Sequence, residues 1–466
     1  MTTYPKFDDP MPAFTRAAGA AVTHHDDHGR IIGLAENVLH HGAGGGVDDT
    51  AAFQAAINAG HRVHVPTHPT GGNYIIKNKL TVTNTAGLYM TGDFNKGYGS
   101  VILCDSFPNT TTDLFELPAT GFPQLQLEDL YFDHSTGNPP RDFYRQTVAD
   151  SQGCNWRNLY VQNFGGYGFN APVEIVAPRF TNCNFISCGA GGMYFALGNA
   201  VGIDHCRMAG NGGTADLEIA GGEGYTIDSP VFDGFAPGAA NFSRLKTAGR
   251  GVTIINPYVE WTSVSASGTL RDIYFNGATN AALIGGVGQV TPGSFTGAGS
   301  LTAVEINNST NVQLVNVPTA DWGGGISPYD LKVIGSTGVI ASTSSVAARV
   351  SVDVASEPYT EIYSFGRLLR SGQNISPVLL GATADCGGAR TVVISNGGAT
   401  NMTNLSGAQS GHIISLFFAN ANTTLMHAAN GSNGAFQLRG AANYNPPANS
   451  VLTFMCAGTS WYESVR

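Results

Sequence analysis

The sequence of 466 residues predicts an all-β protein organised as a parallel solenoid. Its composition is the first indication: only 12% of the residues are charged, whereas 42% are hydrophobic and 61 are glycine. Typical domains have about 25% charged residues, but the apolar content is sufficient for a large core, so low charge does not indicate disorder. The second indication is a strand-like pattern that recurs every 23 to 29 residues in the middle of the chain, since strand repeats of this length are typical of solenoids.

Residues 1–40 are expected to form an irregular N-terminal leader or attachment segment. The first residues, MTTYPKFDDPMP, lack the apolar run of a secretory signal, and no stretch approaches the roughly eighteen apolar residues of a membrane span. The HHDDHGR segment at 24–30 favours a solvated turn over a metal site, because no scaffold of further ligands is evident around it. Seven cysteines, an odd number without metal-type spacing, favour reduced thiols and synthesis in a cytoplasm.

Residues 41–100 contain the signals of a capping helix and the first coils. Asp49 or Thr50 is a suitable helix N-cap. Phe53, Ala56 and Ile57 form one apolar helical face, and the helix is expected to end at the glycine of INAGHR. The segments VHVP, NYIIKNKLTV and AGLYMTGD then have the pattern of short strands.

This opening segment resembles that of the pectate-lyase-like right-handed parallel β-helix proteins, above all bacteriophage tailspikes and related polysaccharide-degrading enzymes. In that superfamily an Asp-Asp-Thr-x-Ala helix covers the first coil, and a Val-x-x-Pro-x-Gly-x-Tyr strand follows it. Here DDTAA at 48–52 matches, as do Val65, Pro66 and Tyr74, while THPTGGN lengthens the turn. The resemblance implies a right-handed parallel β-helix with a short N-terminal capping helix and a small C-terminal antiparallel β-domain.

Residues 101–330 carry the repeat and are expected to form the parallel β-helix with the catalytic face. Six clear copies begin at Leu127, Trp156, Phe180, Ile203, Ile227 and Ile254, and fainter copies begin at Leu283 and Val312. Parallel stacking of these units buries a continuous interior. In this register Cys183 and Cys206 are neighbours in an apolar column, which favours core filling over a redox pair. Asn158, Asn182 and Asn256 share a column suited to an amide ladder along the turn.

The repeat fades in residues 331–360, a Ser/Thr/Ala-rich segment that we interpret as a connector. Residues 361–466 then show strands joined by Asn/Gly turns, which predict a small antiparallel β-domain. Its last residues, AGTSWYE, resemble the closing strand of small β-domains in phage tail fibres and tailspikes. This resemblance implies trimerisation or carbohydrate binding, and a simple end cap for the solenoid is an equally good interpretation.

The outer surface of a parallel β-helix carries columns of side chains about 4.8 Å apart, so a column of carboxylates is the pattern that indicates catalysis. Asp233 and Glu260 follow the last apolar residue of successive repeats, Phe232 and Val259, and are expected to point outward on adjacent coils. Glycoside hydrolysis needs two carboxyl groups at close range, one as acid and one as base or nucleophile. Asp233 and Glu260 are therefore the predicted catalytic pair.

Two other arrangements are candidates for the catalytic carboxylates. Asp204 and Asp228 occupy a second outward column on adjacent coils. Glu218 lies on the partner strand ADLEIA and is aligned with Tyr194 and Tyr274. Each arrangement is an alternative to the first pair.

Residues around the predicted pair are expected to bind substrate. They share outward positions or insertions next to it and comprise Arg207, Tyr258, Trp261, His205, Arg244 and Lys246. Tyr258 and Trp261 offer stacking faces for sugar rings, and Arg207 is suited to an acidic or sulfated sugar. Arg244 and Lys246 lie in or near an insertion that raises the wall of a groove. The basic members and the tyrosine are also the residue types that a polysaccharide lyase uses to remove a proton beside a uronate carboxylate.

A net charge of −10 argues against a nucleic-acid-binding protein, and no cofactor, metal or membrane span is expected. The resemblance implies an endo-acting depolymerase of bacterial surface polysaccharide (capsule, exopolysaccharide or O-antigen), most simply a glycoside hydrolase. It further implies a homotrimer that acts outside the cell as a receptor-binding tail component of a virion. A polysaccharide lyase on the same fold and a non-catalytic glycan-binding fibre are the alternatives that remain open.

Overall fold

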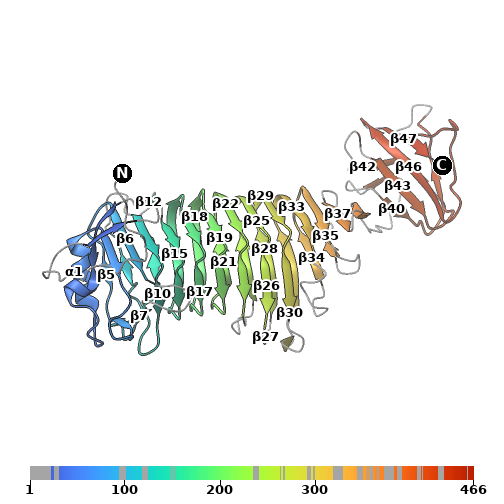
Figure 1. Ribbon diagram of the computed structural model, residues 1–466. Coiled ribbons are helices and arrows are strands. Elements are labelled where there is room, and N and C mark those ends of the chain that lie inside the picture. The colour runs from blue at the N-terminus through green and yellow to red at the C-terminus, as the bar shows by residue number, and fades with distance from the viewer. Residues whose placement is uncertain are drawn as a thin grey trace, which may run out of the picture.

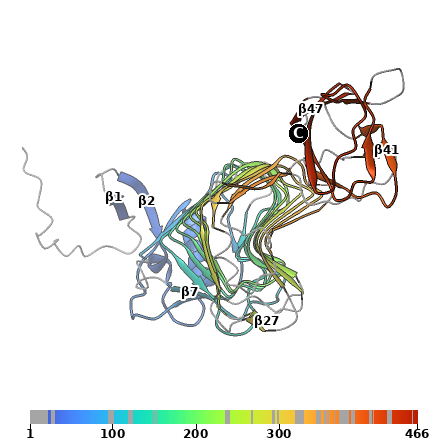
Figure 2. The same ribbon diagram turned by 90° about the vertical axis from the view of Figure 1, so that its right-hand side faces the viewer.

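The computed structural model forms a long stack of parallel β-coils followed by a smaller β-domain (Figure 1). The coils wind right-handed, and Figure 2 shows them superposed along the axis of the stack. The residues that the structure describes are 22–25, 31–93, 101–117, 124–147, 151–152, 154–234, 241–262, 264–265, 268–290, 295–296, 300–318, 329–343, 350–353, 356, 360–364, 367–371, 383–385, 391–406, 411, 413–428, 435–458 and 460–465.

The first of three parallel ladders is the outer surface on which the predicted catalytic pair lies. Its strands are β4 (Tyr74–Ile76), β7 (Val101–Cys104), β10 (Tyr131–Asp133), β14 (Tyr160–Gln162), β17 (Asn184–Ile186), β20 (Arg207–Ala209), β23 (Val231–Asp233), β26 (Tyr258–Trp261) and β30 (Val287–Val290). Most have only three or four residues, because a turn follows each of them in the coil.

The second ladder follows the first within each coil. Its strands are β5 (Leu80–Thr81), β8 (Phe115–Glu116), β11 (Tyr144–Arg145), β15 (Tyr167–Val176), β18 (Gly191–Asn199), β21 (Ala215–Ile219), β24 (Asn241–Thr247), β28 (Thr269–Asn276), β32 (Ser300–Asn307), β34 (Tyr329–Ile334) and β36 (Val350–Val352). The short strand β12 (Ser151–Gln152) also pairs with β15.

The third ladder completes each coil. Its strands are β2 (Ile31–Asn37), β3 (Arg62–Val65), β6 (Gly87–Gly92), β9 (Gln124–Glu128), β13 (Asn155–Arg157), β16 (Arg179–Thr181), β19 (Gly202–Asp204), β22 (Gly222–Asp228), β25 (Arg250–Ile255), β29 (Thr279–Ile284), β33 (Thr310–Val317), β35 (Val339–Thr343) and β37 (Thr360–Ser364). Four strands lie outside this scheme or reverse it: β1 (Val22–His25) pairs antiparallel with β2, β38 (Arg367–Ser371) pairs antiparallel with β37, and β27 (Val264–Ser265) pairs with β31 (Phe295–Thr296).

The first coils are preceded by a 3₁₀ turn, η1 (Val38–His41), and the predicted capping helix, α1 (Thr50–Ala59). Phe53, Ala56 and Ile57 of α1 are buried, as the apolar pattern predicts. Asp49 occupies the N-cap position, but its carboxylate accepts hydrogen bonds from the backbone N–H groups of Gly44 (2.7 Å) and Ile75 (2.9 Å). Asp49 therefore ties the start of the helix to β4. In the described part of the chain, no helix is long and apolar enough to cross a membrane.

The pairing register agrees with the predicted repeat over most of the stack. The repeat starts pair in the series Leu127, Trp156, Phe180, Ile203, Ile227, Ile254 and Leu283. The faint copy at Val312 is offset by two residues, because Leu283 pairs with Leu314 and Val312 pairs with Ala281. Both Val312 and Leu314 are buried, and a shift of two residues leaves every side chain on its own face, so alternation alone does not fix this register.

A single apolar core runs through the stack. Its centre is aromatic: the ring of Trp156 lies with centroids 5.3, 5.2 and 5.4 Å from those of Phe143, Phe169 and Phe180. Cys183 and Cys206 are free thiols buried in this core, as predicted. Stacked rings and thiols from coils that are distant in sequence thus hold the ladders in register.

The turn after the third-ladder strand adopts the left-handed conformation in six successive coils. The residues with positive φ at this turn are Asp129, Asn158, Asn182, His205, Ser229 and Asn256. Asparagine and aspartate tolerate this conformation better than most residues. Part of the predicted amide ladder forms here, since Asn158 Nδ2 donates to Asp129 Oδ1 (2.8 Å) and Asn182 Nδ2 donates to Asn158 Oδ1 (3.3 Å). His205 and Ser229 separate Asn256 from these two asparagines.

Parallel coils continue through residues 331–360, for which a connector was expected. β34, β35, β36 and β37 pair in parallel with the preceding coils, and the ladder ends only where β38 reverses direction. Buried serines occupy this part of the stack: Ser309 N–H donates to Ser336 Oγ (3.1 Å), and Ser336 N–H donates to Ser356 Oγ (2.7 Å). Small hydroxyl groups therefore replace apolar side chains, which hides the repeat in the sequence.

The C-terminal β-domain has its own core, which includes Trp461. Its strands are β39 (Thr383–Asp385), β40 (Thr391–Ile394), β41 (Thr400–Met402), β42 (Asn404–Ser406), β43 (Ile413–Phe418), β44 (Thr423–Leu425), β45 (Phe436–Gln437), β46 (Ser450–Ala457) and β47 (Ser460–Val465). The main sheet, in the order β40-β43-β46-β47-β45, is mixed: the pairs at its two ends are parallel, and the central pairs are antiparallel.

Candidate functional site

Asp233 and Glu260 lie on the outer surface of adjacent coils in the first ladder. Phe232 pairs with Val259, and both are buried. Because side chains alternate along a strand, the next residue in each case points outward, and both carboxylates are half-buried. The structure thus brings the two predicted carboxylates together on one face.

The two carboxylates have different partners. Asp233 forms an ion pair with Arg207, with Nη2 to Oδ2 at 2.9 Å and Nε to Oδ2 at 3.0 Å. Glu260 Oε2 accepts a hydrogen bond from the hydroxyl group of Tyr258 (2.8 Å), which in turn accepts one from Gln289 Nε2 (2.8 Å). Burial and the bond to Glu260 raise the pKa of Tyr258, so this hydroxyl stays protonated and keeps donating. One carboxylate therefore faces a cation and the other a neutral donor.

Tyrosine rings continue this surface along the stack. The pairing places Tyr131, Tyr160, Asn184, Arg207, Val231 and Tyr258 in one outward column. The rings of Tyr131 and Tyr160 lie with centroids 4.7 Å apart. The Tyr258–Glu260 arrangement also recurs, since the Tyr131 hydroxyl donates to Asp133 Oδ2 (3.2 Å).

Trp261 and Arg244 do not lie on this surface, contrary to the sequence-based expectation. The inward–outward alternation continues one residue past Glu260, so Trp261 points inward and is completely buried. Its Nε1 donates to Asp272 Oδ1 (2.5 Å), and the Arg244 guanidinium lies 4.0 Å from the centre of its ring. Arg244 is also completely buried, so neither side chain can contact a polymer on the outer surface.

Arg244 instead belongs to a buried polar network behind the carboxylate pair. Its Nη1 forms an ion pair with Asp216 Oδ2 (2.8 Å), and its Nη2 donates to the backbone carbonyls of Gly234 and Glu260 (both 2.7 Å). Burial raises the pKa of Asp272 to about 7, although Trp261 and Arg244 oppose this shift. The sequence signal was present: Asp216, Arg244 and Asp272 hold equivalent positions in β21, β24 and β28, but Arg244 was expected in or near an insertion at the wall of a groove.

The rival carboxylates lie on other ladders. Asp204 and Asp228 pair across β19 and β22 in the third ladder. The exposed His205 lies beside Asp204, with Nδ1 at 2.6 Å from Oδ1, and Ser229 Oγ donates to Asp228 (3.0 Å). These side chains therefore form a separate cluster at the left-handed turn.

Glu218 and Lys246 lie on the second ladder, where they form an ion pair of 2.8 Å. The column there runs Tyr194, Glu218, Lys246, Tyr274. Lys246 thus stands between Glu218 and Tyr274 and neutralises the carboxylate. Among the residues that the structure describes, no three His, Cys, Asp or Glu side chains group as a metal site would require.

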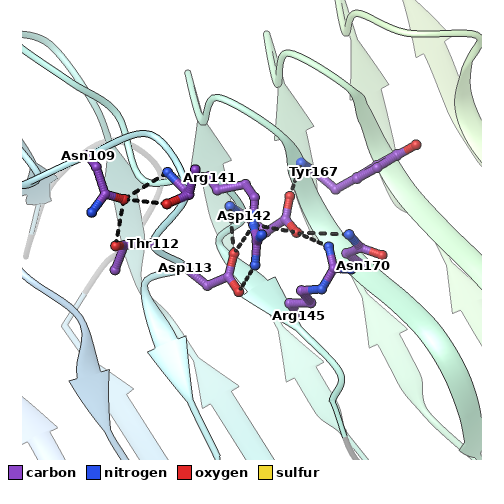
Figure 3. Close-up of polar contacts among 9 residues, drawn as sticks. Asn109, Thr112, Asp113, Arg141, Asp142, Arg145, Tyr167 and Asn170 are labelled. Carbon is purple, nitrogen blue, oxygen red and sulfur yellow. Dashed lines mark hydrogen bonds and ion pairs between the residues drawn. The ribbon is translucent and has the colours of Figure 1, made fainter.

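A further carboxylate pair, Asp113 and Asp142, was not found from the sequence (Figure 3). Arg141 forms an ion pair with Asp113 (2.6 Å), and Asp142 accepts hydrogen bonds from the Tyr167 N–H (2.7 Å) and Asn170 Nδ2 (2.8 Å). Burial raises the pKa of Asp142, whose side chain is only 2% exposed. Because a bound polymer cannot reach it, this cluster ties neighbouring coils together and is not a catalytic candidate.

No protein-family model and no curated protein matches this sequence. Among solved structures, the pre-mature bacteriophage phi29 gene product 12 is 13% identical with a TM-score of 0.36, over 83% of this chain and 65% of that one. The bacteriophage CBA120 tailspike protein 3 is 11% identical with a TM-score of 0.40, over 92% and 68%. The Acinetobacter phage vb_AbaP_AS12 gp42 tailspike is 12% identical with a TM-score of 0.38, over 91% and 78%. The chain spans less than two thirds of the phi29 protein.

The strand pairing of this chain itself establishes the fold as a parallel β-helix. At TM-scores below 0.5 and identities this low, these similarities carry no argument about fold or function. The function must therefore be argued from the chain's own side chains.

Proposed function

We propose that the chain is an endo-acting depolymerase of a bacterial surface polysaccharide, and that Asp233 and Glu260 are the carboxylates of a glycoside hydrolase. The observation that carries this proposal is the pair itself: two outward carboxylates on adjacent coils, one facing Arg207 and the other Tyr258. Adjacent strands lie about 4.8 Å apart. Carboxyl groups on adjacent strands can therefore reach the separations of about 5–9.5 Å that retaining and inverting glycosidases use.

The different partners suggest different roles. Asp233, oriented by its ion pair with Arg207, is the proposed base or nucleophile. Glu260, held by a neutral hydroxyl, is the proposed acid that protonates the glycosidic oxygen as the bond to the anomeric carbon breaks. Asp233 then either attacks that carbon directly or takes a proton from the attacking water.

The shape of the surface supports a polymer as substrate. The outward column on the same face as the pair holds Tyr131 and Tyr160 at one end and Tyr258 at the other, and rings of this kind stack on sugars. The proposal includes assembly as a homotrimer and service as a receptor-binding component of a virion tail. Residues 1–40 are the proposed attachment segment, and the C-terminal domain is proposed to trimerise or to bind carbohydrate.

The test is incubation of the purified protein with a panel of capsular polysaccharides and lipopolysaccharides, followed by reducing-end assay and mass analysis of the fragments. Asp233→Asn and Glu260→Gln are expected to lose about 10²–10⁴-fold in rate. Asp204→Asn is the matched control, because Asp204 is an outward carboxylate on a neighbouring coil of another ladder, and it should keep its activity.

Each contrary result has a distinct meaning. Unsaturated, ultraviolet-absorbing fragment ends would indicate a lyase. Full activity of both variants would reject the site, and loss in Asp204→Asn would move it to the third ladder. Polysaccharide binding without any fragments would indicate a glycan-binding fibre.

A further inference from the structure

A hollow of about 270 Å³ lies on the third ladder in the first coils, away from the carboxylate pair. Arg62 of β3 pairs with Tyr89 of β6, which pairs with Gln126 of β9, so these three outward side chains stand in one column. His61 and Gln124 complete the polar lining. The volume is at the lower end of ligand sites, which span about 300–1,000 Å³, and therefore suits a ligand the size of one sugar.

Gly87 forms the floor of this hollow. It has a φ of 93°, and a Cβ there would lie 1.9 Å from the backbone carbonyl oxygen of Gln124. No other residue fits, so this outward position is left without a side chain between β3 and β9. The hollow is thus fixed by the backbone of the stacked coils.

The charge of the hollow is opposite to that of the chain. The protein has a net charge of −10, but no described residue that lines the hollow is acidic. Most described arginines of the solenoid have a carboxylate partner, as Arg157 has Glu128, whereas Arg62 has no ion pair with any described residue. An unneutralised guanidinium on an acidic protein attracts an anion to that point.

The remaining groups suit a sugar more than a bare anion. The Tyr89 hydroxyl donates to Glu128 Oε2 (2.8 Å), which fixes its ring, and burial raises the pKa of Tyr89 so that the hydroxyl stays neutral. Gln126 Nε2 donates to Gln124 Oε1 (2.9 Å), which orients both amide groups. Aromatic faces and amides are the groups that pair with sugar rings and hydroxyls.

We propose that this hollow binds one carboxylate-bearing monosaccharide unit, such as a uronate of a surface polysaccharide. Arg62 holds the carboxylate, and Tyr89 with the two glutamines holds the ring. The site binds and does not cleave, since no described carboxylate lines it. It lies on another ladder than Asp233 and Glu260, so it is independent of the depolymerase proposal.

The test measures direct binding of methyl β-D-glucuronide to the full chain by titration calorimetry and saturation-transfer NMR. Methyl β-D-glucoside should bind at least about ten-fold more weakly, and Arg62→Gln should weaken glucuronide binding about ten- to one-hundred-fold, because a hydrogen bond to a charged group contributes about 1.5–3 kcal/mol. The control is Arg250→Gln, which removes an exposed arginine of the same ladder and should leave binding unchanged.

A second variant separates a sugar site from an anion site. Gln124→Ala should weaken the glucuronide but not inorganic phosphate. Absence of glucuronide binding, equal binding of glucoside, equal loss in Arg250→Gln, or phosphate binding as tightly as glucuronide would each overturn the proposal. All these readouts are independent of polymer cleavage.

Discussion

Two arginine–aspartate pairs connect the same two coils of the solenoid, one on the outside and one on the inside. Outside, Arg207 of the lower coil binds Asp233 of the upper coil at 2.9 Å; inside, Asp216 of the lower coil binds Arg244 of the upper coil at 2.8 Å. The side chains of the outer pair are 41% and 18% exposed, and those of the inner pair are completely buried. Nearly identical contacts therefore stand in opposite environments.

The difference separates function from support. The outer pair is accessible, so its charges can be offered to a ligand, and exposed ion pairs contribute little to stability. The inner pair carries a large desolvation cost, which is offset only because Arg244 also donates to the carbonyls of Gly234 and Glu260. Those carbonyls directly follow or belong to the proposed catalytic residues, so the inner pair fixes the backbone on which the outer carboxylates stand.

The largest expected effect is a loss of stability when the inner pair is broken. Arg244→Met leaves the Asp216 carboxylate buried without its cation, and it should lower the free energy of unfolding by about 3–5 kcal/mol. The matched outer change, Arg207→Met, should lower it by less than about 1 kcal/mol. Urea and thermal unfolding of both variants check this difference.

A double variant tests the cause. In Arg244→Met combined with Asp216→Asn, the buried charge is gone, so part of the stability should return. Equal losses in the single Arg244→Met and Arg207→Met variants would show that the inner pair is not the support inferred here.

The next largest effect is a pH dependence of the free energy of unfolding, caused by the buried Asp272. The pKa of Asp272 is about 7 in the folded chain but about 4 when unfolded, so the folded chain holds this proton more tightly. The stability that this proton contributes is fully present below about pH 4 and is lost at about 1.4 kcal/mol per pH unit as the pH rises towards 7. Unfolding of the wild type and Asp272→Asn at several pH values should show this slope only in the wild type. Parallel slopes would contradict it.

A smaller effect, on depolymerase turnover, is expected when the outer pair is broken. Arg207→Met removes the cation that faces Asp233, and it should reduce depolymerase turnover about ten-fold or more, in line with the worth of a charged hydrogen bond. Fragment release at saturating polymer measures this turnover. If Arg207→Met changes only the apparent affinity, then Arg207 binds polymer without acting on Asp233.

The smallest effect on turnover is expected from the Tyr258 hydroxyl group, which donates a hydrogen bond to Glu260. Tyr258→Phe removes one neutral hydrogen bond, so turnover should fall about two- to ten-fold. Tyr131→Phe is the matched control, because it removes the same kind of bond to Asp133 several coils away. Its turnover should equal that of the wild type, and equal losses in both variants would indicate a structural role for these hydroxyls.

The fold and most of the register could be predicted from the sequence because the repeat carries two independent signals. Its period sets the coil length, and the alternation of residues such as Phe232 and Val259 fixes which face is inward. The positions of Asp233 and Glu260 on adjacent coils followed from these two facts. Their partners also lie where the columns predicted: Arg207 stands on the coil before Asp233, and Tyr258 stands on the same strand as Glu260.

The failures arise where a coil turns from one ladder to the next. Trp261 was expected outside because a wall was expected after Glu260, yet the alternation continues and carries it inward. Arg244 was expected to bind substrate from an insertion at the wall of a groove, but it lies buried in β24, and its partners Asp216 and Asp272 lie 28 residues away on either side. The coils after residue 330 escaped detection because buried serines satisfy each other there in place of an apolar pattern.

The buried thiols of this chain allow local unfolding to be measured at native residues, without introducing new cysteines. Cys183 and Cys206 lie in the middle of the stack, and burial raises the pKa of Cys206 well above its usual value; Cys456 is buried in the separate core of the C-terminal domain. A thiol of this kind reacts with an alkylating reagent only while its surroundings are open. The rates at which these cysteines are alkylated would therefore report local opening of the central coils and of the C-terminal domain separately.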